Sequence, residues 1–165
     1  MKKGFTLVEL LVVIAIMSIL TVVTVSQFQT AKRKANDVAR KGDLNAVAKA
    51  LQMYYSDYGK LPLASADGKI MVVDGDPIAW GEEFSDASGY IYMKTLPREN
   101  KLTTPYCYIT DANRKVYALF AMLENTQDSQ CISGSTYRCG NNSKEYCFAY
   151  YSPNIILNND GSIKY

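Results

Sequence analysis

An apolar run near the N-terminus constrains this chain more than any other feature. Residues 5–25 contain a single charged side chain, Glu9, and residues 10–25 are apolar apart from one Ser and two Thr. About 20 such residues, as a helix, cross the roughly 30 Å of hydrocarbon in a bilayer. A carboxylate at mid-bilayer costs on the order of 2.5–3.5 kcal/mol, and less near the interface. We therefore expect the run to be a membrane-length helix in which Glu9 has a partner.

Two simple interpretations of this N-terminus stay open. The run could be a cleaved secretory signal, with Lys2 and Lys3 as its basic region and residues 10–20 as its apolar region. Glu9 is out of place in such a signal, and residues 24–26 only loosely match a small-x-small cleavage site. The run could also be a plain membrane anchor with its N-terminal lysines in the cytoplasm.

The third interpretation is a resemblance. Residues 2–9 read Lys-Lys-Gly-Phe-Thr-Leu-Val-Glu and, with the apolar run behind them, resemble the N-terminal motif of the type IV pilin-like family, which includes type II secretion pseudopilins. The resemblance implies that a membrane aspartyl peptidase cuts between Gly4 and Phe5 and N-methylates the new terminus. It also implies that Glu9 contacts the amino terminus of a neighbouring subunit.

The chemistry of this motif can be argued from the residues themselves. Gly4 lets the chain leave helical geometry, so that a protease can bind it extended. Glu9 follows the new terminus by four residues and can meet the positive end of the helix dipole. Alternatively, Glu9 reaches toward the lipid headgroups.

The helical pattern continues well beyond the apolar run. Residues 5–58 contain no Pro and one Gly, Gly42, and a helix of this length measures about 80 Å. Gly42 could mark a bend or a close packing contact.

A stripe of small and aromatic residues at three- and four-residue steps predicts the face that packs on the rest of the protein. Its members are Ala35, Val38, Ala39, Gly42, Ala46, Ala50, Tyr54 and Tyr58, widened by Leu44, Val47 and Leu51. We expect the helix to stop at Tyr58, because Gly59 suits a C-terminal cap and Pro62 prevents continuation.

Strand signals dominate the C-terminal half. Residues 106–110 and 115–123 predict a hairpin, and residues 145–151 predict a third strand. Both faces of the segment 115–123 are apolar, so one face should pack on the helix and the other under loops. We expect residues 63–89 to be irregular apart from a short strand at 70–73, and residues 90–94 to form a helical turn. The turn signal at 158–161 predicts a last short hairpin.

These elements predict an α+β fold of the pilin-like kind, with a long N-terminal helix packed on a small antiparallel sheet. The expected parts are a leader (1–4), a transmembrane helix (5–25), an amphipathic helix (26–58) and a globular head (59–165). Residues 57–62 and 92–97 also resemble the helix end and a later segment of the G-type major pseudopilins.

Four cysteines, Cys107, Cys131, Cys139 and Cys147, lie in the predicted head. An even number in an exported domain favours two disulfides, and free thiols would fit only a reducing compartment. Our predicted pairs are Cys131–Cys139 and Cys107–Cys147. The second pair needs the first and third strands to be neighbours, and a simple three-strand meander would exclude it.

Metal and cofactor signals are weak. With no Cys-x-x-Cys pair and no His, a zinc site is disfavoured. The resemblance to G-type pseudopilins implies a calcium site in a C-terminal loop, but the matching loop here lacks a clear acidic cluster. Asp74, Asp76 and Asp128 are weak calcium candidates, because Asp serves local turns as often. Otherwise we expect no cofactor.

Composition also limits the function. The absence of His removes the usual general base, and no phosphate-binding loop or nucleic-acid motif is present, so we do not expect an enzyme. The formal charge is +2, with an excess of basic residues in 31–60 and of acidic residues in 61–165. These regions could attract each other between subunits or could simply be solvated. The basic residues 32–34 could contact anionic headgroups.

The expected function is therefore that of a filament subunit, most specifically a type II secretion pseudopilin. The resemblance implies the following partners: further copies of the chain, related minor subunits, a prepilin peptidase, and an inner-membrane platform with a separate cytoplasmic ATPase. We expect one membrane pass, a cytoplasmic N-terminus and an exported head, extractable into a periplasmic or extracellular filament. The alternatives are a type IV pilus subunit for adhesion, motility or DNA uptake, and an anchored binding domain that does not polymerise.

Overall fold

The computed structural model describes residues 4–72, 75–131, 137–139, 145–153, 155–158 and 162–164. The chain divides into two compact units, Met1–Asn36 and Asp37–Tyr165.

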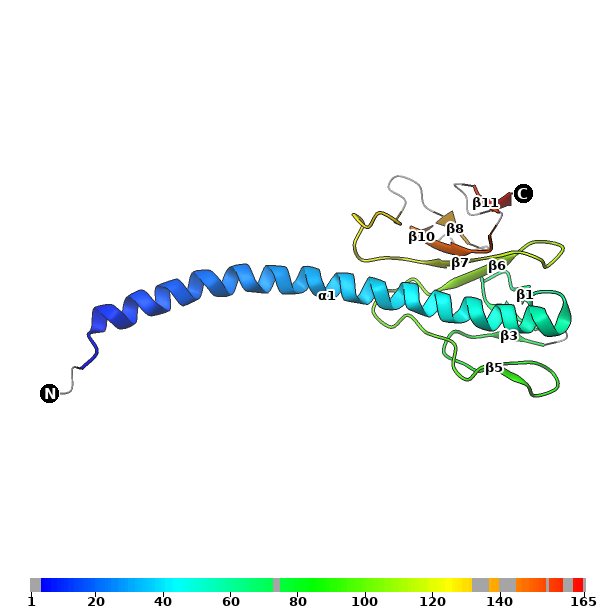
Figure 1. The fold of residues 1–165 in the computed structure, drawn as a ribbon, viewed down its shortest axis with the longest axis horizontal. Helices are drawn as coiled ribbons and strands as arrows, with labels where there is room; N and C mark the ends of the chain where they lie inside the picture. Colours follow the sequence, from blue (N-terminus) through cyan, green and yellow to red (C-terminus); the bar gives the residue numbers. More distant parts are fainter. Residues whose placement is uncertain are drawn as a thin grey trace. The chain divides into compact units, whose positions relative to one another are not determined.

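Helix α1 (Leu7–Tyr58) is 52 residues long and contributes to both units (Figure 1). It ends where the sequence predicts. Gly59 has a φ of 64°, in the left-handed region, and its N–H donates to the carbonyl of Tyr55 over 2.8 Å. This geometry is the usual helix stop at glycine.

The first unit is the apolar part of α1. Its best 18-residue window has a mean hydropathy of 2.7, and by length and composition α1 is the one helix of the described residues that could cross a membrane. Three hydroxyl groups of this part form hydrogen bonds within the helix. Those of Ser18, Thr21 and Thr24 each donate to the backbone carbonyl four residues earlier, at 2.7–2.8 Å. Internal satisfaction of this kind is what a bilayer requires of a polar group.

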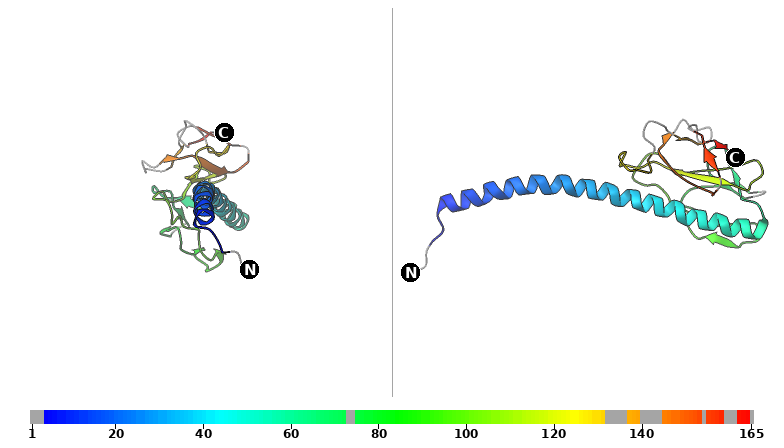
Figure 2. Two further views of the ribbon diagram at one scale, coloured as in Figure 1. Left: turned by 90° about the vertical axis from the view of Figure 1, so that its left-hand side faces the viewer. Right: turned by 45° about the horizontal axis from the view of Figure 1, so that its top comes forward.

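In the second unit, three strands form the sheet that packs on α1. They are β6 (Cys107–Thr110), β7 (Tyr117–Ala121) and β10 (Phe148–Tyr151), antiparallel in the order β10-β7-β6. The predicted hairpin and third strand are thus confirmed. Figures 1 and 2 show this sheet on one side of the second half of α1 and strand β5 on the other.

Strand β7 is buried on both faces, which explains its unbroken apolar sequence. One face, with Leu119 and Ala121, lies in the main core together with Leu44 and Leu51 of α1. The opposite face, with Ala118 and Phe120, lies in a second cluster that includes Tyr137 and Tyr146. The prediction that β7 packs on the helix on one side and under further chain on the other is confirmed.

Shorter strands complete the head. Three of them form one sheet, β1 (Leu63–Ala64), β2 (Ile70–Met71) and β3 (Pro77–Ile78). The rest pair in twos: β4 (Phe84–Ser85) with β5 (Ile91–Met93), β8 (Tyr137–Arg138) with β9 (Glu145–Tyr146), and β11 (Ile156–Leu157) with β12 (Ile163–Lys164). The last pair confirms the expected C-terminal hairpin, although residues 159–161 of its turn lie outside the described residues.

Two local predictions in this region are wrong. The segment 63–89 is predicted to be irregular apart from a strand at 70–73, but its described part contains the four strands β1 to β4. Residues 91–93 form a strand, not a helical turn. Tyr92 points inward and is 7% exposed, whereas Ile91 is 48% exposed, which is the alternation of a strand. The aromatic rings of Tyr92, Phe84 and Tyr54 pack on one another with centroids 5.2–5.7 Å apart. The segment is too short for its hydrophobic pattern to distinguish a strand from a helical turn. The packing of these rings favours the strand.

The buried face of α1 also differs from the predicted stripe. Leu44, Val47, Ala50, Leu51 and Tyr54 are buried as expected, but the first four members of the stripe are exposed. The charged residues Asp37 and Arg40 take the buried positions at this end of the helix instead. They are buried because they are bonded to each other and to the head, as described below.

The predicted disulfide pairing is wrong as well. The bonds are Cys107–Cys139 and Cys131–Cys147, with Cα–Cα distances of 6.2 Å and 4.7 Å. The sheet is the simple meander that excludes a Cys107–Cys147 bond, because β7 separates β6 from β10. Each disulfide lies in a different core cluster, Cys107–Cys139 on the outer face of the sheet and Cys131–Cys147 on the helix side.

Gly68 lies against the first disulfide, and this contact gives a test of the fold. Gly68 has a φ of 75°, and a Cβ at this position would overlap the Sγ of Cys107. Gly89 has a φ of 85° with nothing within 4 Å of a Cβ. We expect Gly68→Ala to destabilise the head by about 2–4 kcal/mol, through backbone strain and overpacking together.

Gly89→Ala is the matched control, because it adds the strain alone, about 1 kcal/mol. The measurement is denaturant unfolding of both variants, with non-reducing peptide mapping of Cys107–Cys139. Equal destabilisation by the two substitutions would contradict this packing.

Candidate functional site

The N-terminal site is built on the first turn of α1. Residues 4–6 are not helical, and Phe5 is 83% exposed. Thr6 is the N-cap residue: its Oγ1 accepts the N–H of Glu9 at 3.2 Å. In return, one carboxylate oxygen of Glu9, Oε2, accepts both the N–H and the hydroxyl of Thr6 at 2.9 Å. This reciprocal arrangement is a capping box.

The capping box supplies a partner for Glu9 within the chain itself. From the sequence we predict a partner for Glu9 on another subunit and do not identify Thr6 as a partner. The signal was available, because Thr-x-x-Glu directly before an apolar run is the sequence pattern of a capping box. All the bonds from Thr6 use Oε2, and no bond to Oε1 is found among the described residues. The second oxygen therefore remains available to another donor.

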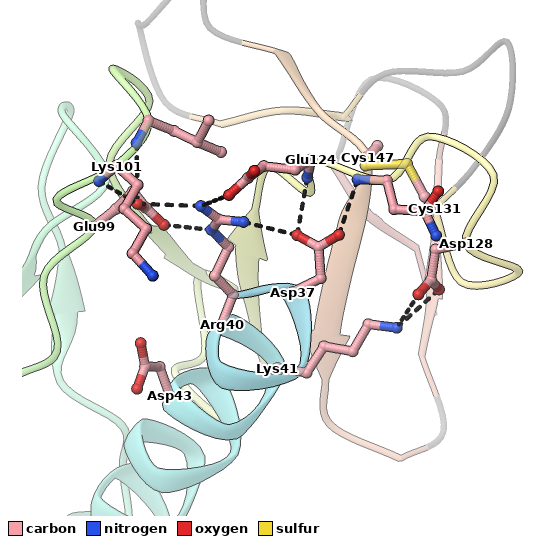
Figure 3. Close-up of polar contacts among 12 residues, drawn as sticks. Asp37, Arg40, Lys41, Asp43, Glu99, Lys101, Glu124, Asp128, Cys131 and Cys147 are labelled. Atoms are coloured by element: carbon pink, nitrogen blue, oxygen red, sulfur yellow. Dashed lines mark hydrogen bonds and ion pairs between the residues drawn. A yellow bond between two sulfur atoms is a disulfide. The ribbon is translucent and has the colours of Figure 1, made fainter. Parts of the chain in front are cut away.

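A buried charge cluster lies in the second unit, where α1 meets the loops of the head (Figure 3). At its centre Arg40, 3% exposed, bonds to three carboxylates. The guanidinium contacts Asp37 at 2.7 Å, Glu99 at 2.5 Å and Glu124 at 2.8 Å. These residues come from the helix, from the segment before β6 and from the segment after β7, so one side chain joins three parts of the head.

The carboxylates of this cluster are also held by backbone donors. Asp37 accepts the N–H groups of Glu124 and Asn125 at 2.9 and 2.8 Å. Glu99 accepts the N–H groups of Lys101 and Leu102 at 2.7 and 3.0 Å. These bonds offset the negative excess of three carboxylates around one guanidinium.

The pKa values follow from this geometry. Burial alone would lower the pKa of Arg40, but its bonds to Glu99, Glu124 and Asp37 raise it above the ordinary value. For Glu99 burial acts to raise the pKa, and the bonds from Arg40, Lys101 and Leu102 outweigh it and lower the pKa. Both groups therefore stay charged at neutral pH.

A second ion pair fixes the loop that carries Asp128. The Nζ of Lys41 contacts both oxygens of Asp128 at 2.8 Å and lies 5.3 Å from the ring centroid of Phe148. The N–H of Cys131 donates to the carbonyl of Asp128 at 2.9 Å, so the loop is tied to the Cys131–Cys147 bond as well. The bond from Lys41 lowers the pKa of Asp128.

This arrangement bears on the calcium candidates. A cation at Asp128 would have to displace Lys41 from both carboxylate oxygens. Asp76 is exposed, and Asp74 lies outside the described residues. Within the described ranges no group of three or more His, Cys, Asp or Glu side chains is arranged so that it could hold a metal ion. Calcium binding stays an untested prediction.

Comparison with known proteins bears on the N-terminal site directly. Residues 1–25 match the family model described as the prokaryotic N-terminal methylation motif. The chain is 28% identical to the type II secretion system core protein G of Pseudomonas aeruginosa over 125 residues, which cover 73% of this chain and 82% of that protein. No solved structure matches the chain at a comparable level of significance.

Two further relatives extend the comparison. The core protein G of Aeromonas hydrophila is 34% identical over 98 residues, covering 59% of this chain and 66% of that protein. The type IV wide pilus major component PilA4 of Thermus thermophilus is 46% identical over 55 residues. That match covers 33% of this chain and 42% of the pilus protein.

The methylation motif, the capped apolar helix and the small antiparallel sheets define a protein of the prepilin class. The similarity to core protein G and to PilA4 agrees with this class. The chain belongs to the type IV pilin-like family.

The charge cluster gives a stability prediction. Arg40→Met would leave three carboxylates without their shared cation, and we expect the head to lose about 3–5 kcal/mol. Arg33→Met removes the same charge and adds the same side chain at an exposed position of the same helix, where a loss within about 0.5 kcal/mol is expected. Denaturant unfolding followed by the fluorescence of Trp80 measures both variants. Similar small losses for both would contradict a structural role for Arg40.

The lowered pKa values of Glu99 and Asp128 predict a pH dependence. Because both carboxyls bind protons more weakly in the folded head, the unfolded chain gains protons first as the pH falls. The stability that they contribute is present at neutral pH and is lost progressively below about pH 5. Urea midpoints between pH 7 and 3 test this, and Lys41→Met should flatten the decline. A midpoint that does not change over this range would refute the assignment.

Proposed function

We propose that this protein is the subunit of a pilus-like filament, and specifically a pseudopilin of a type II secretion system. The observation that carries the proposal is the N-terminal methylation motif set directly on an exposed, membrane-length helix. The proposal is supported by the similarity to core protein G from two organisms.

Processing would use the chain before the helix. A peptidase that cuts after Gly4 meets a segment that is exposed and not helical, as a protease substrate must be. The cut removes the leader lysines and makes Phe5 the new amino terminus. It leaves the capping box intact, because both of its residues follow the cut. The helix therefore keeps its cap after processing.

Assembly would use the remaining oxygen of Glu9. Thr6 holds Oε2 at the helix start and so fixes the orientation of the carboxylate. The amino terminus of a second copy could then approach Oε1 and form an ion pair, which is strong in an apolar surrounding. The exposed apolar side chains along residues 7–25 would pack against the same residues of other copies.

In this proposal the N-terminus and the head also lie on opposite sides of the membrane. Two disulfides belong in an oxidising compartment, so the head would be exported while the N-terminus starts in the cytoplasm. The membrane platform, the peptidase and an ATPase would be separate proteins. We propose no catalytic activity, in keeping with a sequence that has no His.

A type IV pilus subunit is the second candidate, favoured by the 46% identity to PilA4 over 55 residues. The two candidates share the mechanism above and differ in the filament. Long surface filaments in electron micrographs of the producing cell would favour the pilus, and short fibres would favour the pseudopilus.

Two substitutions at Glu9 separate capping from assembly. Gln keeps the capping box but not the charge, whereas Ala loses both. If the ion pair between subunits is required, both Glu9→Gln and Glu9→Ala should reduce filament yield by about tenfold or more, because about 1.4 kcal/mol per contact already gives that factor. Filaments are counted by electron microscopy in cells that contain the assembly machinery.

Mass spectrometry of the N-terminus controls for processing, and every variant should begin at methylated Phe5. Normal filaments from Glu9→Gln would reduce the role of Glu9 to capping. A chain that starts at Met1, or beyond the apolar run, would contradict the prepilin assignment.

A further inference from the structure

Three consecutive basic residues follow the apolar part of α1, and nothing in the filament mechanism above uses them. Lys32, Arg33 and Lys34, here called the basic belt, are all exposed. Successive helical residues are about 100° apart, so the three side chains spread around the helix instead of forming one stripe. From this placement we propose that the basic belt binds the phosphate groups of anionic lipids.

The position of the belt along the helix fits the thickness of a bilayer. From Leu7 to Phe28 the helix rises about 32 Å, close to the roughly 30 Å of the hydrocarbon layer. The centre of the belt at Arg33 is about 7 Å further along, within the headgroup layer that brings the total to about 40–45 Å. Phe28, 70% exposed, is the last large apolar side chain before the belt.

The part of the chain that the structure describes offers the belt no partner. Arg40 and Lys41, only two turns further along α1, are bonded to carboxylates of the head. No hydrogen bond or ion pair joins Lys32, Arg33 or Lys34 to another described residue. Asp37 is within three to five positions of them, but it is already bonded to Arg40 and to two N–H groups. Three cations with no partner among the described residues would therefore lie at the level of the lipid phosphates once the helix is inserted.

This inference rests on the membrane insertion of α1, which belongs to the proposed function. Its consequence goes further: the subunit would prefer anionic lipid in the leaflet that meets the C-terminal end of the apolar run. Attraction of about 1 kcal/mol per basic side chain near an anionic surface corresponds to about a fivefold preference for an anionic over a neutral lipid at each side chain.

Lipid quenching of tryptophan tests the proposal on the full chain. The single tryptophan is moved by combining Trp80→Phe with Phe28→Trp, and the protein is reconstituted in phosphatidylcholine vesicles. Equal fractions of brominated phosphatidylglycerol or brominated phosphatidylcholine are then compared as quenchers. We expect the anionic lipid to associate about fivefold more strongly, and about 0.5 M salt to weaken this preference by screening.

The triple variant Lys32→Gln, Arg33→Gln and Lys34→Gln should abolish the preference. Lys49→Gln, Lys60→Gln and Lys94→Gln remove the same charge from exposed positions of the second unit and should leave it unchanged. Equal quenching by both lipids would overturn the proposal. If the triple variant also lowered the filament yield in that case, the belt would bind a neighbouring subunit instead of lipid. If neither lipid quenches the indole at position 28, the helix is not inserted, and the anchor itself is refuted.

Discussion

The backbone hydrogen bonds of one helix are the constraint on which this protein depends. The apolar part of α1 exposes the side chains that the structure describes there, so none of the described residues stabilises it by packing. It must satisfy its polar groups internally, and it does so at three levels. The main chain forms the helical ladder, the hydroxyls of Ser18, Thr21 and Thr24 return to carbonyls of the same helix, and the capping box closes the first turn. A helix made in this way can move from lipid to a bundle of like helices without exchanging hydrogen bonds.

The head faces a different problem, because its strands are short and its sheets are small. Most of the described strands have two residues, and strands of that length bury little apolar surface. Covalent and ionic contacts supplement the core. Each disulfide closes a loop, of 32 and 16 residues in sequence separation, and bonds of this kind typically contribute 2–4 kcal/mol. Through their ion pairs, Arg40 and Lys41 attach loops that have no strand pairing of their own to α1.

The sequence predicts those features that depend on local periodicity. The end of α1 at Tyr58 is local, and so are the β6–β7 hairpin and the two apolar faces of β7. The disulfide pairing is not local, because it depends on the order of the strands in the sheet. The same pattern of apolar residues along the chain is compatible with several strand orders. The buried face of α1 was misjudged for a related reason: hydrophobicity favours Val38 over Asp37, and only the bonds of Asp37 to Arg40 and to two N–H groups reverse that order. The Thr6–Glu9 capping box could have been found from the sequence, since its spacing is a known pattern.

The basic residues of α1 show how position along one helix decides the role of a charge. Lys32, Arg33 and Lys34 are exposed, so nothing in the described chain removes their solvation. Arg40 and Lys41 are bonded to the head and have lost much of their hydration, a cost that only fixed carboxylates can offset. The transition takes place at Asp37, whose carboxylate receives two N–H groups of the head and the guanidinium of Arg40. Removing Asp37 would leave those two N–H donors without their acceptor and would take away one of the three carboxylates bonded to Arg40, so this residue couples the helix to the segment that follows β7.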